Sequence, residues 1–343
     1  MLFNKTLSSF KTIPITQIHQ IKSQRKRNSI FTSFVPISSL PSQMEPGNNE
    51  ITHEFRFFRV FKNGQLQMFN QIHKIPPFND PVLRVQTKDV VILTEPTISA
   101  RIFMPVVHDT TRKLPLLFHI HGGGFCFESA FSSPHQKYLT TLAAAADAII
   151  VSVEYGLFPD RPIPACYEDS WVGLQWVATH VNRDGPESWL NDHVDFARVF
   201  IGGDSAGGNI SHNLAVRIGS QGLPGVNVVG MVLVHPYFGG TNDDKMWLYM
   251  CPINGGLDDP RLKPNAEDLS KVGCERVLVF VAEKDHLNGV GKWYCDELKK
   301  SEWKGSLGVA ETKDEGHCFH IEDLTTQNSL ALIERFASFI KEI

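Results

Sequence analysis

The feature that most constrains this chain is the regular alternation of strand-like and helix-like segments after residue 85. Apolar runs typical of strands lie at 89–93, 99–105, 114–121, 148–155, 198–203, 228–238, 276–285 and 306–314. Segments with helical propensity or spacing lie at 135–148, 167–181, 206–219, 289–301 and 324–343. Strand and helix joined by short links predict an α/β fold with a mostly parallel sheet. Ligands then bind where the parallel strands end.

Ser205 is the first candidate for chemistry. It stands in the pattern G-x-S-x-G, between Gly203 and Gly207, after the predicted strand 198–203 and before the helix 206–219. A nucleophile on a sharp strand-to-helix turn needs this context, and glycine neighbours let the strand and the helix approach closely. The alternative is an ordinary serine in a glycine-rich loop, because the pattern alone is common.

A second glycine-rich motif follows the predicted strand 114–121. It reads His121-Gly122-Gly123-Gly124-Phe125. The backbone N–H groups of Gly123 and Gly124, together with that of Ala206, are predicted to form an oxyanion hole. The alternative, a phosphate-binding loop, lacks both the G-K-[ST] ending and the G-x-G-x-x-G spacing.

A serine hydroxyl needs a base, and the base needs an acid that orients it. Asp285 ends one predicted strand and His317 follows the next, so the order Ser205, Asp285, His317 is that of α/β-hydrolases. Glu283 and His320 are alternatives for the acid and the base. His286 is expected to point elsewhere.

Composition narrows the range of partners. Lys and Arg total 33 and Asp and Glu total 37, so the net charge is −4, and the body of the chain has no basic cluster suited to nucleic acid. No apolar run reaches the length of a membrane span. The six cysteines are scattered without a C-x-x-C pair, which favours free buried thiols over a disulfide framework or a zinc site. No oligomeric state follows from these features.

Residues 1–44 differ from the rest of the chain. They contain six Lys or Arg, twelve Ser or Thr and no carboxylate. This composition is typical of an organelle transit peptide, which would direct the chain to a chloroplast or a mitochondrion. A disordered extension, or a true start at Met44 that would leave a cytoplasmic protein, are the alternatives. Residues 45–343 are predicted to form the folded domain.

Four stretches together carry a resemblance to a known family. They are "HGGGFCFESAFSS", "VEYGLFPDRPIPACYEDSW", "GDSAGGNISHNLAVR" and "RVLVFVAEKD…EGHCFH". The chain resembles the plant carboxylesterases of the hormone-sensitive-lipase-like branch of the α/β-hydrolases over close to 290 residues. The resemblance implies an α/β-hydrolase fold with an eight-stranded sheet, helices on both faces and an N-terminal lid. It implies hydrolysis of small-molecule carboxylic esters by Ser205, Asp285 and His317, with no metal or organic cofactor.

Three departures from the family bear on structure. Gly156 stands where the family usually has arginine, so an ion pair is expected to be missing. The segment after Phe238 is short for a lid, and residues 286–291 replace a more polar run. Residues 45–85 and 239–265, called here the candidate lid segments, are expected to cover the strand ends.

Two related functions and a loss of function stay open at this point. Gibberellin receptors resemble this fold but lack the catalytic histidine, whereas His317 is present here. The 2-hydroxyisoflavanone dehydratases are also close in sequence, and an intact Ser205 favours an esterase without excluding that lyase chemistry. A decayed gene copy with a poorly folding lid is the third alternative.

Overall fold

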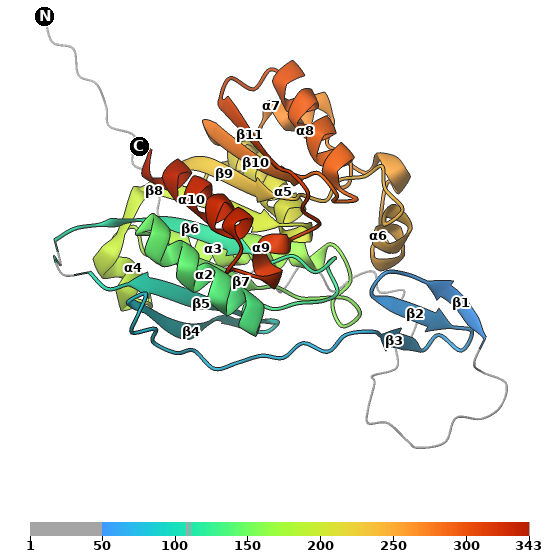
Figure 1. Ribbon diagram of the computed structural model, residues 1–343, viewed down its shortest axis with the longest axis horizontal. Coiled ribbons are helices and arrows are strands. Elements are labelled where there is room, and N and C mark those ends of the chain that lie inside the picture. Colours follow the sequence, from blue (N-terminus) through green and yellow to red (C-terminus); the bar gives the residue numbers. More distant parts are fainter. Residues whose placement is uncertain (1–49, 108, 110, 343) are drawn as a thin grey trace, which may run out of the picture. The chain divides into compact units, whose positions relative to one another are not determined.

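The computed structural model describes residues 50–107, 109 and 111–342 (Figure 1). The chain divides into two compact units, Met1–Asn48 and Asn49–Ile343, and all described residues belong to the second. The predictions for residues 1–44 therefore lie outside the described residues.

An eight-stranded sheet forms the centre of the second unit. Its strands are β4 (Val85–Thr94), β5 (Thr97–Pro105), β6 (Leu114–Ile120), β7 (Ile149–Glu154), β8 (Val194–Asp204), β9 (Val228–Val234), β10 (Arg276–Ala282) and β11 (Ser306–Thr312). They are ordered β11-β10-β9-β8-β6-β7-β5-β4. Strands β6 to β11 pair in parallel, while β5 pairs antiparallel with both β7 and β4. The predicted mostly parallel eight-stranded sheet is confirmed.

Helices cover both faces of this sheet (Figure 1). The helices of the described residues are α2 (Ser133–Ala146), α3 (Ala165–Ala178), α4 (Ser188–His193), α5 (Ala206–Gln221), α6 (Asp244–Met250), α7 (Ala266–Ser270), α8 (Asn288–Lys300), α9 (Phe319–Glu322) and α10 (Gln327–Lys341), with the 3₁₀ turn η1 at Gly256–Asp258. Of these, α6 and η1 lie away from the central sheet. Strand β10 shows why two layers are needed. Val279 packs into the core under α3, α5 and α8, whereas its neighbour Phe280 packs into the core under α2 and α10. Side chains of a buried strand alternate between faces, so both faces require cover.

Two element boundaries differ from the prediction, each for a local reason. A strand is predicted to run through Phe238, but β9 ends at Val234, because His235 turns the backbone at a φ of +49° and Pro236 follows. The last helix is predicted from residue 324, but α10 begins at Gln327. The side-chain oxygen of Thr326 accepts a hydrogen bond from Ser329 N at 3.1 Å and caps the helix there. Helices α4, α6, α7 and α9, of four to seven residues each, are absent from the sequence prediction.

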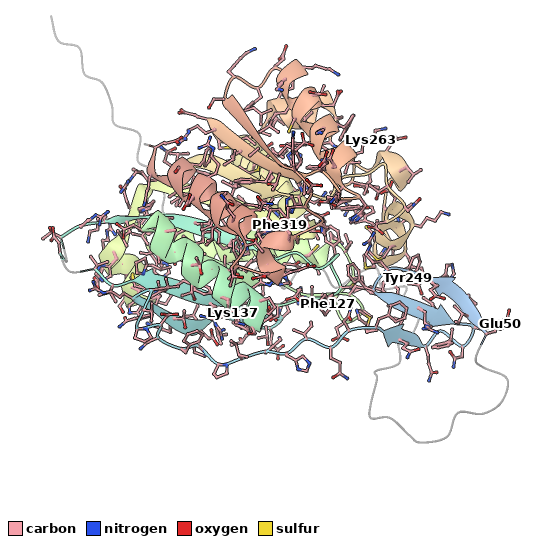
Figure 2. The ribbon with its side chains drawn as sticks, viewed as in Figure 1. Glu50, Phe127, Lys137, Tyr249, Lys263 and Phe319 are labelled. Atoms are coloured by element: carbon pink, nitrogen blue, oxygen red, sulfur yellow. The ribbon has the colours of Figure 1, made fainter. Side chains whose placement is uncertain are left out.

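The two candidate lid segments contact one another. The first contains a three-stranded antiparallel sheet of β1 (Ile51–Glu54), β2 (Phe58–Phe61) and β3 (Leu66–Met68). The second contains α6, whose Tyr249 lies against this sheet (Figure 2). The Tyr249 ring centroid is 5.2 Å from that of Phe55 and 6.0 Å from that of Phe58. Aromatic contacts of this kind hold the two segments together.

The space beside Gly156 is filled by another arginine. A Cβ on Gly156 would lie 2.4 Å from Arg161 Cδ, so no larger residue fits here without displacing that side chain. Arg161 Nη2 lies 2.7 Å from Asp169 Oδ1, and Gly156 N donates to Asp169 Oδ2 at 2.9 Å. An ion pair is thus present beside Gly156, although residue 156 itself carries no charge.

Candidate active site

The predicted site residues come from loops at one edge of the sheet. Ser205 follows β8, Asp285 and His317 follow β10 and β11, and the glycine loop 121–124 follows β6. These four strands are parallel, so their carboxyl ends meet at the same edge. The topology therefore brings together residues that are up to 196 positions apart in the sequence.

Ser205 lies on a strained turn. Its φ of +54° and ψ of −116° are rare for a residue with a Cβ, and the turn is held by a hydrogen bond from Ser205 N to Val234 O at 2.9 Å. A Cβ on Gly203 or on Gly207 would lie 2.2 or 2.0 Å from the carbonyl oxygen of Ile120. The two glycines thus allow β8, α5 and the end of β6 to approach closely enough to form the turn.

His317 lies between Ser205 and Asp285. Its Nε2 is 2.9 Å from Ser205 Oγ, and its Nδ1 is 2.8 Å from Asp285 Oδ2. Burial favours a higher pKa for Asp285, but hydrogen bonds from His286 and His317 bring that pKa well below its ordinary value. An ionised carboxylate only accepts hydrogen bonds, so His317 Nδ1 carries the proton and Nε2 accepts from the Ser205 hydroxyl.

The alternative acid and base lie elsewhere. Glu283 is exposed and accepts a hydrogen bond from Asp314 N at 2.9 Å. His320 is fully buried, with its ring at 4.8 Å from that of Tyr138 in an edge-on contact. The expectation that His286 points elsewhere is wrong, because His286 Nδ1 lies 3.1 Å from Asp285 Oδ1.

The glycine loop presents free backbone donors. Gly123 and Gly124 adopt φ values of +94° and +59°, and Gly123 O accepts hydrogen bonds from Cys126 N and Phe127 N. Within the described part of the chain, no hydrogen bond occupies the N–H of Gly123 or of Gly124. Ala206 is the first residue of α5, where an N–H has no partner within the helix. Donors of this kind can hold a negatively charged oxygen.

Asp204 anchors the glycine loop, and this role was not predicted from the sequence. Its buried Oδ2 accepts a hydrogen bond from Gly122 N at 3.1 Å, and its Oδ1 lies 3.5 Å from Nε2 of both His119 and His135. Burial opposes ionisation, but the two imidazoles bring the pKa of Asp204 well below its ordinary value. Despite burial, Asp204 and Glu128 raise the pKa of His135 to about 9. The histidines of "LLFHIH" were the available signal, because polar residues inside apolar runs need buried partners.

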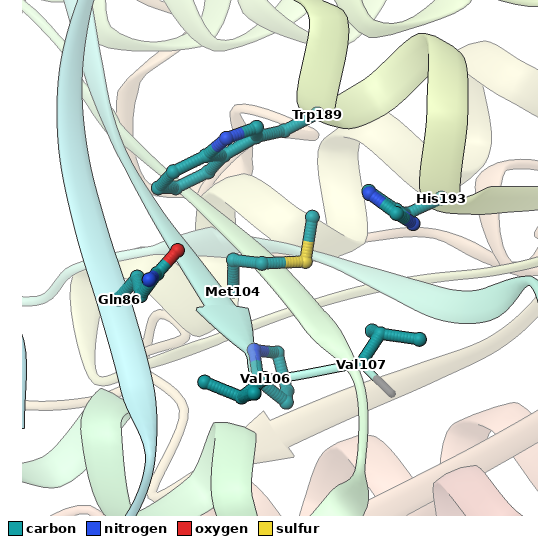
Figure 3. A pocket seen from close by; sticks show the side chains of 7 residues that line it. Gln86, Met104, Val106, Val107, Trp189 and His193 are labelled. Atoms are coloured by element: carbon teal, nitrogen blue, oxygen red, sulfur yellow. The ribbon is translucent and has the colours of Figure 1, made fainter. Parts of the chain in front are cut away.

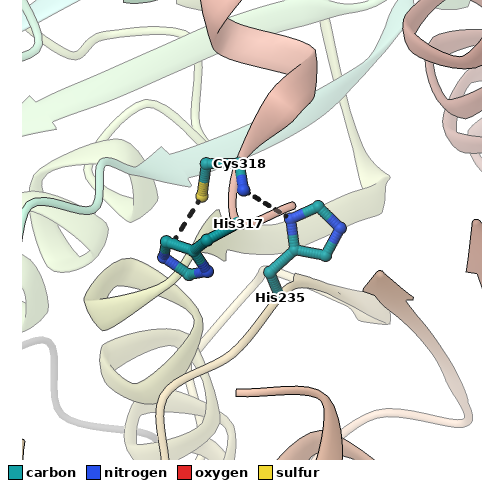
Figure 4. Close-up of side chains that lie close together, drawn as sticks. All are labelled: His235, His317 and Cys318. Atoms are coloured by element: carbon teal, nitrogen blue, oxygen red, sulfur yellow. Dashed lines mark hydrogen bonds between the residues drawn. The ribbon is translucent and has the colours of Figure 1, made fainter. Parts of the chain in front are cut away.

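Two clusters of possible metal donors surround His317. The donor atoms of His235, His317 and Cys318 lie within 4.8 Å of one another, and so do those of Asp285, His286 and His317. Figure 4 shows that Cys318 N donates to His235 Nδ1 at 3.1 Å and that Cys318 Sγ lies 3.5 Å from His317 Nε2. Hydrogen bonds inside both clusters already engage these atoms. The expectation that no metal or cofactor is required stays a prediction.

All six cysteines are free, as predicted, and five of them are buried. Cys318 is the partly exposed one. Burial raises the pKa of the thiols of Cys126 and Cys274 to about 12, so these side chains behave as small apolar groups.

A pocket of about 220 Å³ lies away from Ser205 (Figure 3). It is lined by Gln86, Met104, Pro105, Val106, Val107, Trp189 and His193. Strand β5 runs antiparallel to β7, so its carboxyl end lies at the edge of the sheet opposite to the Ser205 site. This pocket brings none of the predicted site residues together.

Comparison with known proteins identifies the fold family of the chain. A family model described as the alpha/beta hydrolase fold matches residues 117–321. The chain belongs to the α/β-hydrolase fold family. The resemblance and the fold predicted from the sequence are thereby confirmed.

The match to two plant relatives covers nearly the whole length of each relative. A 2-hydroxyisoflavanone dehydratase from Glycyrrhiza echinata is 43% identical over 306 residues, which are 82% of this chain and 93% of the relative. "Probable carboxylesterase 1" from Arabidopsis thaliana is 43% identical over 303 residues, which are 83% of this chain and 95% of the relative. These names do not separate the two chemistries.

Solved esterase structures share the fold. An esterase from Pyrobaculum calidifontis is 25% identical with a TM-score of 0.61, covering 75% of this chain and 85% of that one. Carboxyl esterase 2 from Tuber melanosporum is 22% identical with a TM-score of 0.64, covering 77% of this chain and 88% of that one.

Over the described residues, no helix has the length and apolar character to cross a membrane.

Proposed function

We propose that this chain is a serine carboxylesterase that hydrolyses carboxylic esters of small molecules. The observation that carries the proposal is the continuous path from Ser205 Oγ to His317 Nε2 at 2.9 Å and from His317 Nδ1 to Asp285 Oδ2 at 2.8 Å. A nucleophile within reach of a base that an acid orients is the arrangement required for acyl transfer. The relatives and solved structures named as carboxylesterases or esterases support the same chemistry.

The proposed reaction proceeds in two halves through an acyl-enzyme. Ser205 Oγ attacks the ester carbonyl carbon while His317 Nε2 takes the hydroxyl proton, and the carbonyl oxygen becomes an oxyanion. The N–H groups of Gly123, Gly124 and Ala206 stabilise this oxyanion. The bond to the alcohol then breaks, and His317 returns the proton to the leaving oxygen.

Water completes the cycle in the second half. His317 Nε2 takes a proton from water as the water oxygen attacks the acyl carbon. The bond to Ser205 Oγ breaks, the serine recovers the proton, and the carboxylic acid leaves. Throughout, Asp285 holds the imidazole in the required tautomer and stabilises its cation.

Active-site labelling tests the proposal directly. The purified full-length chain is treated with a fluorophosphonate probe, which phosphonylates only an activated serine, and the labelled peptide is mapped. We expect the label on Ser205. Ser205→Ala is expected to lose both the label and the turnover of p-nitrophenyl acetate while keeping the thermal transition of the wild type. A folded Ser205→Ala protein with wild-type turnover would refute the assignment.

A second candidate is the dehydratase chemistry of a relative at the same 43% identity. In that case His317 removes a proton from the substrate, and a molecule of water leaves without addition of Ser205. Incubation with 2-hydroxyisoflavanone and mass spectrometry distinguishes the two. A product lighter by one water that Ser205→Ala still forms would favour the lyase.

We also propose that residues 1–44 direct the chain to a chloroplast or a mitochondrion. The proposal rests on their basic, hydroxyl-rich and acid-free composition. N-terminal sequencing of the native protein tests it. A mature chain that begins shortly after residue 44 supports import, whereas a chain that begins at Met1 or at Met44 itself contradicts it.

A further inference from the structure

Asp285 is shared between two imidazoles, and only one of them belongs to the proposed triad. Its Oδ2 accepts from His317 Nδ1 at 2.8 Å. Its Oδ1 faces His286 Nδ1 at 3.1 Å and also accepts from Leu287 N at 2.8 Å. The Asp285 side chain is 1% exposed, so these contacts replace water around the carboxylate. The orientation of Oδ2 toward His317 is therefore set in part by what holds Oδ1.

His286 reaches a second carboxylate with its other nitrogen. His286 Nε2 lies 3.1 Å from Asp243 Oδ2, and Asp243 is the residue immediately before α6 in the second candidate lid segment. Arg56, from the first candidate lid segment, lies beside the same carboxylate, with its Nε at 3.3 Å. The side chains Arg56, Asp243, His286 and Asp285 thus form a row of alternating charge that ends at His317.

A carboxylate on each side determines the protonation of this ring. Both nitrogens of His286 face oxygens that can only accept, so only the doubly protonated imidazolium makes both hydrogen bonds. Its bonds to Asp243 and Asp285 accordingly raise the pKa of His286 to about 9, against the effect of burial. The groups that face it are Asp243, Asp285, Arg56 and the ring of His317, whose centroid lies 5.1 Å away. A cation thus lies next to the base near neutral pH.

We propose that His286 is a positioning residue that fastens the triad acid Asp285 to the candidate lid segments through Asp243 and Arg56. The inference rests on the proposed esterase function and deepens it. His286 holds the Asp285 carboxylate in the plane in which Oδ2 meets His317.

Kinetics of three variants test the role. His286→Gln keeps a side-chain donor but removes the charge and one of the two contacts. We expect kcat for p-nitrophenyl acetate to fall about tenfold with little change in KM, since the acid acts on the reaction rather than on binding. Because the pKa of His286 is about 9, we expect kcat of the wild type to fall as pH rises through 9, when the ring keeps only one of its two hydrogen bonds, and we expect His286→Gln to lack this fall. A purely structural role would not produce this difference.

Asp243→Asn tests the link to the lid without touching the proposed triad or its neighbour. We expect a smaller fall in kcat at neutral pH, and the alkaline fall in kcat is expected to begin at a lower pH because Asp243 no longer raises the pKa of His286. The double variant is expected to show less than the sum of the two effects, because both break one row of contacts. His73→Gln, an exposed histidine outside this row, is the matched control and is expected to match the wild type. If His286→Gln does not fold, Asp243→Asn alone still decides the question.

The outcomes separate this inference from the proposed function. If the wild type takes no fluorophosphonate label, the esterase proposal fails first. If the wild type is labelled on Ser205 but His286→Gln and Asp243→Asn keep both the wild-type kcat and its fall as pH rises through 9, the positioning role of His286 is wrong while the esterase stands.

Discussion

Gly207→Ala is the substitution whose effect follows most directly from the geometry of the turn. A Cβ at residue 207 would lie 2.0 Å from Ile120 O and 2.6 Å from His121 O. Both are backbone atoms at the end of β6, so no side-chain rotation can relieve the contact. The start of α5 must move by more than about 1 Å to restore van der Waals distance, and overpacking of this kind costs about 3 kcal/mol. In a unit of nearly 300 residues, that lowers Tm by roughly 5 °C.

The same displacement acts on the chemistry. Ser205 and the N–H of Ala206 both lie on the segment that must move, and a shift of about 1 Å at reacting groups lowers kcat by about 10²-fold. Thermal denaturation and turnover of p-nitrophenyl acetate measure the two effects. Gly289→Ala in α8 is the control, because a Cβ there meets nothing within 4 Å, and it should leave turnover unchanged. A Gly207→Ala protein with wild-type Tm and turnover would show that the close approach is not required.

Three further outcomes are expected. Asp204→Asn should destabilise the protein by about 3 kcal/mol and lower kcat, because the buried cation of His135 loses one of its two carboxylate partners and the glycine loop loses its anchor; chemical denaturation checks the first effect and ester turnover the second. The pKa of His286 is raised to about 9, so its contribution to stability is present below pH 6.5 and lost as pH rises through 9. Discounted for solvent exposure, this contribution to the free energy of unfolding is about 1 kcal/mol. A Tm that falls over this pH range as much in His286→Gln as in the wild type would contradict it. Phe57→Ala should raise KM for p-nitrophenyl esters, since the Phe57 ring covers Gly124 (a Cβ there would lie 2.4 Å from Phe57 Cε2), while the more exposed Phe69→Ala should not.

Periodicity was sufficient for the central sheet and most helices of the second unit. A short continuous apolar run such as that of β10 predicts a buried strand, because apolar residues on both faces of a short segment require cover on both sides. The short helix α4 was missed, since six residues hold too few positions to show a period. The early end of β9 was missed because a single residue, His235, turns the chain there.

Some residues of the candidate site were predicted from the sequence, and others were found only in the structure. Ser205, Asp285 and His317 were named from chain order and from the strands before them, and the structure brings them within hydrogen-bonding distance. His286 and Asp204 were not assigned a role from the sequence. Nothing local predicts that residue 286 turns toward Asp243, 43 positions away, or that residue 204 meets Gly122, 82 positions away.

The sequence by itself determined which segments are strands and helices, and hence which loops meet at one edge of the sheet, because hydrophobic period and glycine placement are local properties of the chain. Only the tertiary structure decided which side chains meet across that edge. Loop direction and strand register set those contacts, and both depend on the packing of the whole unit. The nucleophile, base and acid could therefore be proposed from the sequence, whereas the row from Arg56 to Asp285 and the anchor of the glycine loop at Asp204 could not.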